Sequence, residues 1–264
     1  MLLHGRDPEK GGQVLSELRR ETGNEHLEFF CADFASLAEV RRLAEEVKSG
    51  HRTLDILINN AGIGGGAHGA LLDSSGAVER EHGESAKPRS LETSRDGYEL
   101  RFAVNYLAGF LLTNLLLPEL MASPAPRVVA VSSIGQSAID FDDVMLMRGQ
   151  DAMHAYRQSK FAQVMFTFEL AERLKDNGVT VVAVHPASFM DTKMVAESGI
   201  TPKSTIAEGA DAIMHAAVAE ELIGAQELFL NGKTAARSRE EQAYDPEARR
   251  RFWDLSAKLS SLPA

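Results

Sequence analysis

The feature of this sequence that most restricts its fold is the alternation of short apolar runs with longer amphipathic stretches. The run Val128-Val129-Ala130-Val131 has no polar position, which is typical of a strand buried on both faces. The stretch 36–48 instead places its apolar residues at helical spacing. Strands covered by helices on both faces form a mostly parallel sheet between two helical layers. The sequence therefore predicts an α/β fold with a doubly wound parallel sheet.

Strands and helices are expected to alternate along the whole chain, so that residues 1–264 form a single domain. The expected strands are residues 1–3, 27–32, 54–59, 127–132, 179–185 and 227–231. The expected helices are residues 10–21, 36–48, 98–120, 155–176, 205–220 and 246–262. Ser36 followed by Glu39 matches the capping-box pattern of a helix start. The polar stretch 68–96 is expected to be a loop insertion, and residues 195–264 are expected to supply substrate-side and C-terminal helices.

The composition argues against several functional classes. The formal net charge of −10 makes a nucleic-acid partner unexpected, because duplex binding depends on Lys and Arg contacts to phosphate. The single cysteine, Cys31, cannot form an internal disulfide, which fits a reducing compartment. Neither an apolar run of membrane-spanning length nor a signal-peptide pattern occurs. We therefore expect a cytoplasmic protein without a membrane span, and we expect no metal site.

The strongest chemical signal is the pair Tyr156 and Lys160 at the start of an expected helix. A spacing of four residues places both side chains on one helical face. A free phenol has a pKa of about 10, and a neighbouring ammonium lowers that pKa by favouring the phenolate. A phenol adjusted in this way can donate or accept a proton at a substrate oxygen. The pair alone is weak evidence, because Tyr and Lys four residues apart often occur on helices by chance.

Three further polar signals follow or interrupt apolar runs. Ser133 ends a buried strand, where it can contact a ligand or simply close a turn or cap a helix. The segment Asn59-Asn60-Ala61-Gly62 follows another strand, and its small residues permit close approach of a ligand, although a plain turn also explains it. Asn105 lies within an otherwise apolar helix, where an unpaired amide would cost about 1–3 kcal/mol. Asn105 therefore belongs either to a site or to a kink in the helix.

Taken in chain order, these residues resemble the motifs of the short-chain dehydrogenases/reductases. The matching positions are Asp33 after an expected strand, Asn60-Ala61-Gly62, Asn105, Ser133, and the pair Tyr156 and Lys160. The resemblance runs from Leu2 to about Met194 and is looser beyond. The segments 96–116 and 139–143 look most like the retinol-dehydrogenase-like branch. The resemblance implies a Rossmann-like fold and an oxidoreductase that moves a hydride between NADP(H), with NAD(H) possible, and a carbonyl or alcohol.

The resemblance also implies roles for individual residues. Tyr156 would be the proton donor and acceptor, and Lys160 would lower its pKa and hold the nicotinamide ribose. Ser133 would orient the carbonyl, and Asn105 would support a water relay. Arg6 follows the first expected strand, where a guanidinium can pair with the 2′-phosphate of NADP, although it can also be a solvated turn residue. The residues expected to bind the cofactor are Arg6, Asp33, Phe34, Asn60, Ala61, Gly62, Tyr156, Lys160, Pro186, Ala187 and Thr192.

The sequence departs from this family in two places. The family begins with a strand and a Gly-rich turn that brings the pyrophosphate to a helix N-terminus, and this sequence contains neither. We therefore expect an N-terminally incomplete fold that lacks on the order of thirty residues, the size of one strand–helix unit. Loss of that strand would expose both of its neighbours in the sheet. In addition, Pro186-Ala187 stands where the family has Pro-Gly, and since Ala tolerates a positive φ poorly, this loop is expected to differ.

Two alternatives to this oxidoreductase remain open. One is a truncated, catalytically inactive protein of the same fold that acts only as an interaction partner, which the missing Gly-rich turn suggests. The other is an epimerase or dehydratase of the extended branch, which shares the Tyr/Lys pair but usually needs a larger C-terminal domain. For the oxidoreductase, the expected partner is a small, apolar carbonyl or alcohol compound. The family resemblance favours a homodimer or homotetramer, and so do helices 98–120 and 155–176, which are apolar on more than one face.

Overall fold

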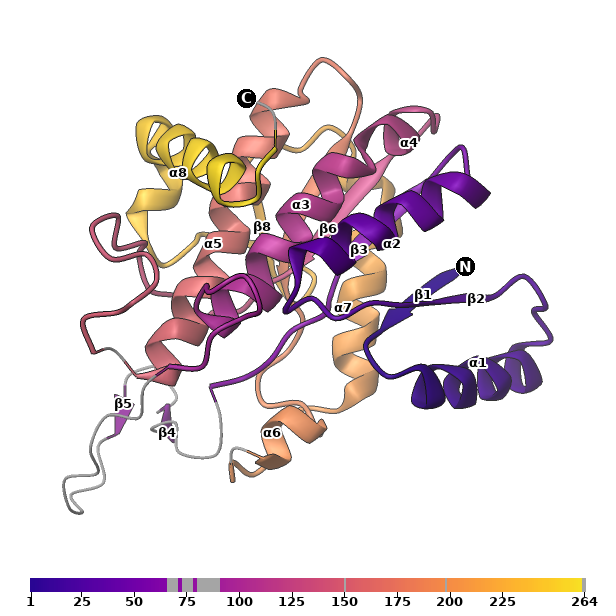
Figure 1. Cartoon of the computed structure of the whole chain (residues 1–264), viewed down its shortest axis with the longest axis horizontal. Coiled ribbons are helices and arrows are strands. Elements are labelled where there is room, and N and C mark those ends of the chain that lie inside the picture. The colour runs from indigo at the N-terminus through magenta and orange to yellow at the C-terminus, as the bar shows by residue number, and fades with distance from the viewer. Residues whose placement is uncertain (66–70, 73–77, 80–90, 150, 198, 263–264) are drawn as a thin grey trace.

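A computed structural model describes residues 1–65, 71–72, 78–79, 91–149, 151–197 and 199–262, and its mostly parallel sheet with helices confirms the predicted α/β fold (Figure 1). The strands are β1 (Leu2–Gly5), β2 (Glu28–Cys31), β3 (Ile56–Asn59), β4 (Leu71–Leu72), β5 (Val78–Glu79), β6 (Arg127–Val131), β7 (Thr180–His185), β8 (Leu228–Asn231) and β9 (Thr234–Ala236). The α-helices are α1 (Pro8–Thr22), α2 (Leu37–Gly50), α3 (Ala108–Leu115), α4 (Leu117–Met121), α5 (Ala152–Arg173), α6 (Lys193–Glu197), α7 (Ile206–Val218) and α8 (Pro246–Leu259). The remaining turns are the π-helical η1 (Phe102–Leu107) and the 3₁₀-helical η2 (Glu220–Leu222) and η3 (Glu241–Tyr244).

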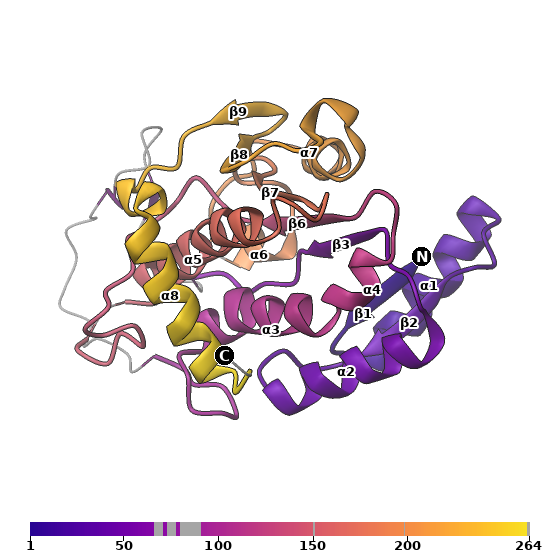
Figure 2. The ribbon, with the colours of Figure 1, turned by 90° about the horizontal axis from the view of Figure 1, so that it is seen from above.

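The main sheet has five strands in the order β3-β6-β7-β8-β9, of which only β9 pairs antiparallel. Every residue of β6 and β7 is buried, because α5 packs on one face and α7 on the other (Figure 2). Successive side chains of β6 enter different apolar clusters, Val128 on the α5 side and Val129 on the α7 side. Burial on both faces is what the fully apolar runs predicted.

The sheet is interrupted between β1 and β3. Strands β1 and β2 pair in parallel as a separate two-stranded sheet, and Figure 2 shows this pair and α1 to one side of the main sheet. On β3, the apolar side chains of Ile56 and Ile58 are 40% and 38% exposed. The doubly wound sheet expected from the sequence is thus divided, with β1 and β2 separate from the five-stranded sheet. The N-terminal incompleteness expected from the sequence stays a prediction.

The expected helix 98–120 is divided into the π-helical turn η1, then α3, then α4. A π-helical turn adds a residue to the helical repeat, a distortion often found at functional sites. Helix α4 starts afresh with Pro118 in its first turn, where the missing N–H of proline is tolerated. Apolar periodicity could not reveal the boundary between η1 and α3, because Leu107 and Ala108 on its two sides are both buried.

The capping box expected at Ser36 and Glu39 is wrong. Ser36 is the N-cap of α2 but its side chain makes no capping hydrogen bond. Instead, the Leu37 amide donates to the Asp96 carboxylate at 2.9 Å. Since Asp96 approaches from a distant part of the chain, no local pattern could show this contact. A complete capping box does form at the start of α7, between Thr205 and Glu208.

Helix α8 packs against α5, and its aromatic side chains also contact η1 and α3 (Figure 2). Phe252 stacks on Tyr106 with ring centroids 5.0 Å apart, and Trp253 stacks on Phe166 at 5.9 Å. These contacts bury the second apolar face, which was one reason to expect a homodimer or homotetramer. The oligomer stays a prediction that rests on the family resemblance alone. Most of the expected loop insertion 68–96 lies outside the described residues. Among the described residues, no helix is both long and apolar enough to span a membrane.

Candidate active site

The residues predicted to be catalytic converge where β6 ends and α5 begins. Ser133 follows β6, Tyr156 and Lys160 lie in the first half of α5, and Asn105 lies in η1. Asp151 caps α5 by accepting a hydrogen bond from the His154 amide at 2.6 Å, which fixes the start of the helix two turns before Lys160. The elements that carry these residues are therefore held by the core and by a cap.

Tyr156 lies beside Ser133, and its environment differs from the expectation. Burial raises the pKa of Tyr156, and a hydrogen bond with the Ser133 hydroxyl acts in the opposite direction. Lys160 Nζ lies 5.8 Å from the centre of the Tyr156 ring. The expected lowering of the Tyr156 pKa by Lys160 is therefore wrong for this structure, because desolvation of the phenolate is the larger effect.

Lys160 is buried, and its ammonium points toward the end of β6. Its Nζ donates a hydrogen bond to the Val131 carbonyl at 2.8 Å, and its own carbonyl accepts one from the Ser132 hydroxyl at 2.6 Å. Burial lowers the pKa of Lys160 to about 8. The pKa of Lys160 is thus close enough to neutral pH for the side chain to exchange a proton. The hydrogen bond to β6 fixes its position.

Asn105 joins the loop after β3 to helix α5. Its Oδ1 accepts a hydrogen bond from the Ile63 amide at 2.7 Å, and its Nδ2 donates to the Ile63 carbonyl at 3.0 Å and to Ser159 Oγ at 2.9 Å. Ser159 Oγ in turn donates to the Tyr156 carbonyl at 2.7 Å. Asn105 therefore belongs both to a distorted helical turn and to the site. Its side chain is engaged in fixing the loop, and the water relay stays a prediction.

Gly62 leaves open the space beside these groups. A Cβ at this position would lie 3.2 Å from Asn105 Oδ1 and 3.6 Å from Lys160 Nζ. The neighbouring Asn60 is exposed and Ala61 is half-buried. The predicted segment Asn60-Ala61-Gly62 therefore lies at the site, and a ligand can approach its backbone closely.

Three of the residues expected to bind the cofactor, Arg6, Asp33 and Phe34, lie at the ends of β1 and β2. Arg6 is exposed in the turn after β1. Asp33 accepts a hydrogen bond from the Ala35 amide at 3.0 Å and forms an ion pair with Arg95 at 3.3 Å. The Phe34 side chain is buried and stacks on His4, with ring centroids 4.1 Å apart. Its ring is therefore committed to the core, which leaves its backbone as the part that can face a ligand.

The loop after β7 carries Pro186, Ala187 and Thr192. Pro186 is buried, while Ala187 and Thr192 are partly exposed. Among the described residues outside glycine, the positive φ in this loop falls on Phe189, at 50°, rather than on Ala187. The loop thus bends two residues later than the Pro-Gly pattern suggests, which is how Ala187 is tolerated.

Two residues of the site were missed by the sequence reasoning. His185, the last residue of β7, is hydrogen-bonded through Nε2 to Ser188 Oγ at 3.0 Å. Burial and the nearby charge of Lys160 lower the pKa of His185 to about 4, so it is neutral at pH 7. Ser159 is the other. A histidine at a strand end and a serine within Tyr156-Arg157-Gln158-Ser159-Lys160 were visible signals, but only the fold brings them into contact with the loops.

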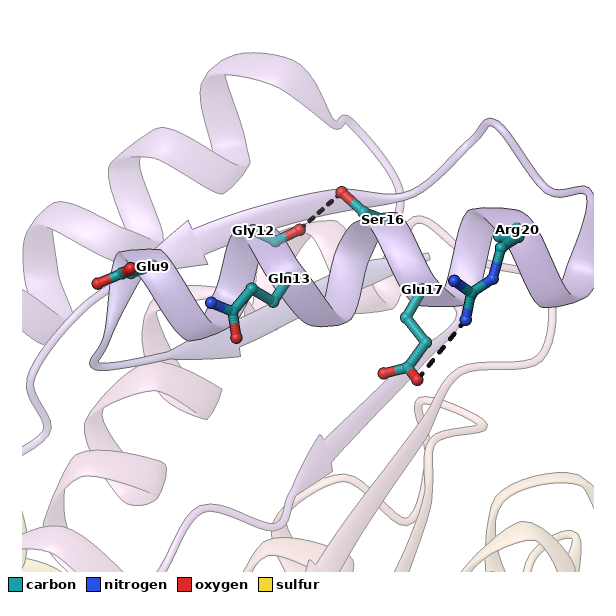
Figure 3. Close-up of a pocket in the computed structure, with 6 residues that line it drawn as sticks. All are labelled: Glu9, Gly12, Gln13, Ser16, Glu17 and Arg20. Carbon is teal, nitrogen blue, oxygen red and sulfur yellow. Dashed lines mark hydrogen bonds and ion pairs between the residues drawn. The ribbon is translucent and has the colours of Figure 1, made fainter.

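A shallow, open depression elsewhere on the surface is unrelated to this chemistry. It lies on the outer side of α1, and Figure 3 shows the residues that line it. All are exposed: Glu9, Gly12, Gln13, Ser16, Glu17 and Arg20. None belongs to the predicted set.

Comparison with known proteins gives the family of this chain. The model of the short chain dehydrogenase family matches residues 1–203. Human retinol dehydrogenase 13 is 35% identical over 282 residues, covering 100% of this chain and 78% of the relative. Human retinol dehydrogenase 11 is 32% identical, covering 98% and 77%, and human polyprenol dehydrogenase is 30% identical, covering 99% and 78%.

Solved structures show the same fold. A protein from Mycobacterium paratuberculosis is 28% identical with a TM-score of 0.70, covering 100% of this chain and 85% of that one. A short chain dehydrogenase from Shigella flexneri, solved with NADP, is 24% identical with a TM-score of 0.64, covering 88% and 86%. The chain therefore belongs to the short-chain dehydrogenase/reductase family of NAD(P)-dependent enzymes. Within that family it belongs to the retinol-dehydrogenase-like branch.

Proposed function

We propose that this protein transfers a hydride between NADP(H) and an apolar carbonyl or alcohol compound, with Tyr156 as proton donor and acceptor. The observation that carries the proposal is the convergence of Ser133, Tyr156 and Lys160 at the end of β6, beside the space left open at Gly62. The apolar substrate class is supported by the names of two relatives, which are a retinol and a polyprenol dehydrogenase.

The residues present fit the nicotinamide end of the cofactor. The cradle at Gly62 is open beside Lys160, so Lys160 and Tyr156 would hold the nicotinamide ribose. The loop with Pro186, Ala187 and Thr192 would hold the nicotinamide amide and phosphates. When bound, NADP(H) supplies or accepts the hydride. Arg6 supports NADP over NAD, because it is exposed at the end of β1 and a guanidinium pairs with a 2′-phosphate.

The proton chemistry then belongs to two hydroxyl groups. Ser133 donates a hydrogen bond to the substrate oxygen and orients it toward Tyr156. In reduction Tyr156 gives its phenolic proton to that oxygen, and in oxidation it takes the proton back. Both groups are partly buried, and exclusion of water strengthens each hydrogen bond. Lys160 would hold the nicotinamide ribose, and with a pKa of about 8 it keeps a large part of its charge at neutral pH.

The first experiment is a titration of the 264-residue chain with NADPH, followed by nicotinamide fluorescence. Saturable binding is the expected result, and turnover of an apolar aldehyde such as retinal should then be detectable. Tyr156→Phe should abolish turnover because the proton donor is lost, whereas NADPH should still bind, less than about tenfold more weakly, because Lys160 still holds the ribose and only one hydrogen bond is lost. Full turnover by Tyr156→Phe would refute the assignment. Absence of NADPH binding would favour the inactive interaction partner.

A further inference from the structure

A buried ion pair fixes the loop that follows β3, outside the set of predicted catalytic residues. Arg101 Nη1 lies 3.1 Å from Glu99 Oε1, and the two side chains are 8% and 1% exposed. Arg101 Nε also donates a hydrogen bond to the Gly64 carbonyl at 3.0 Å. The second carboxylate oxygen of Glu99 accepts a hydrogen bond from the Phe102 amide at 2.7 Å. The guanidinium is thus tied to the loop, and through Glu99 to the first residue of η1.

The loop of residues 62–65 is a closely packed wall of the candidate site. A Cβ on Gly64 would lie 2.8 Å from Met194 Cγ, and a Cβ on Gly65 would lie 2.8 Å from Met153 Cε. Such separations are shorter than ordinary van der Waals contact. The backbone of the loop therefore touches α6 on one side and the first turn of α5 on the other, with no room for a side chain at either contact.

This packing connects the loop to the proton donor. Met153 lies three residues before Tyr156 on α5, and residues three apart share one helical face. Asn105, in η1, forms hydrogen bonds with both the amide and the carbonyl of Ile63. Arg101, just before η1, binds the carbonyl of the next residue, Gly64. Two successive residues of the loop are therefore held from the same helical segment. Misplacement of a group by about 1 Å can cost up to a hundredfold in rate, so the position of this wall matters for turnover.

We propose that Arg101, held in place by Glu99, is a positioning residue for the reaction. Through the Gly64 carbonyl it sets how closely the loop 62–65 approaches the face of α5 that carries Tyr156. The inference rests on the proposed function, because it concerns the geometry of that same site. A purely structural role for Arg101 would change the stability of the protein, whereas a positioning role changes kcat in the folded enzyme.

The test avoids an unpaired buried charge, because removal of Arg101 alone would leave the Glu99 carboxylate without a partner and destabilise the fold strongly. It compares two double variants that are both neutral, E99Q/R101Q and E99Q/R101M. The glutamine Nε2 occupies the same place along the side chain as the arginine Nε, so it can still donate to the Gly64 carbonyl. Methionine has a similar length and no donor. The two variants therefore differ mainly in one hydrogen bond to the loop.

We expect kcat with NADPH and retinal to be about tenfold lower in E99Q/R101M than in E99Q/R101Q, with KM for NADPH within about twofold. Thermal midpoints of the two variants should differ by less than about 4 °C, the shift expected for at most a single hydrogen bond. Amide hydrogen exchange of a peptide that covers residues 62–65 should be faster in E99Q/R101M. This last measurement does not depend on turnover.

Equal kcat in the two variants would overturn the proposal, whatever the exchange rates. The proposal would also be overturned if E99Q/R101M had a lower kcat together with a clearly higher KM for NADPH and a clearly lower thermal midpoint. Such a result would indicate general loosening of the fold. If the wild-type protein turns over no aldehyde, the proposed function fails by itself. In that case equal exchange rates at residues 62–65 would overturn the structural half of the proposal, and faster exchange in the methionine variant would support it.

Discussion

Replacing Lys160 with methionine is expected to stabilise the folded protein at pH 7, although it removes a group proposed to act in catalysis. Burial lowers the pKa of Lys160 from 10.5 to about 8, so the folded state holds this proton less tightly than the unfolded chain does. Each tenfold difference in proton affinity corresponds to about 1.4 kcal/mol, so the charge costs about 3 kcal/mol below pH 8. Methionine also loses the hydrogen bond to the Val131 carbonyl, worth about 1 kcal/mol. The net expected gain is about 2 kcal/mol.

The sign of the pH dependence follows from the lowered pKa of Lys160. Well above pH 10.5 Lys160 is neutral in both the folded and the unfolded state, so it does not affect stability through its charge. Between pH 10.5 and about 8 the free-energy cost of burying the charge grows as pH falls, and below about pH 8 this cost is constant. Urea unfolding of wild type and Lys160→Met at pH 7, 8, 9 and 10 measures this. The advantage of the variant should shrink as pH rises. Lys175→Met is the control, because Lys175 is half-exposed and its ion pair with Glu172 raises its pKa. A Lys160→Met protein that is less stable than wild type by the same amount at every pH would refute the reasoning.

Two further predictions concern the packing of the fold. Phe252→Ala should lower the free energy of unfolding by about 3–5 kcal/mol, because Phe252 is buried against Tyr106. The control Val14→Ala, at a residue that is 47% exposed, should change the free energy of unfolding by less than about 0.5 kcal/mol. Similar losses in the two variants would contradict the role given to α8. The backbone amides of β1 and β2 should exchange with solvent faster than those of β6 and β7, because the two-stranded sheet has open edges while β6 and β7 are buried throughout. Equal protection in native-state hydrogen exchange would show that the smaller sheet is held by contacts other than strand pairing.

The candidate site was predictable to the extent that its chemistry depends on spacing along one element. Tyr156 and Lys160 share a face of α5 because they are four residues apart, and Ser133 reaches the site because it follows an apolar strand. The electrostatics were not predictable in this way. The expected lowering of the Tyr156 pKa failed because Lys160 Nζ bonds to the Val131 carbonyl and burial dominates. The position of the flexible Lys160 ammonium depends on a carbonyl of the strand β6. The spacing of residues along a helix carries no information about that carbonyl.

The sequence by itself determined the layered α/β class, since a strand without polar residues can only lie between two apolar surfaces, and it determined the order of the candidate catalytic residues. Tertiary structure decided which long-range partners those residues have. Asp96 replaces the Ser36 cap, Arg101 holds the Gly64 carbonyl, and the strand β3 leaves Ile56 half-exposed at an interrupted sheet. The physical reason is that periodicity records which face of an element is buried, whereas a hydrogen bond between distant segments depends on the positions of both segments, which are fixed only when the whole chain has packed.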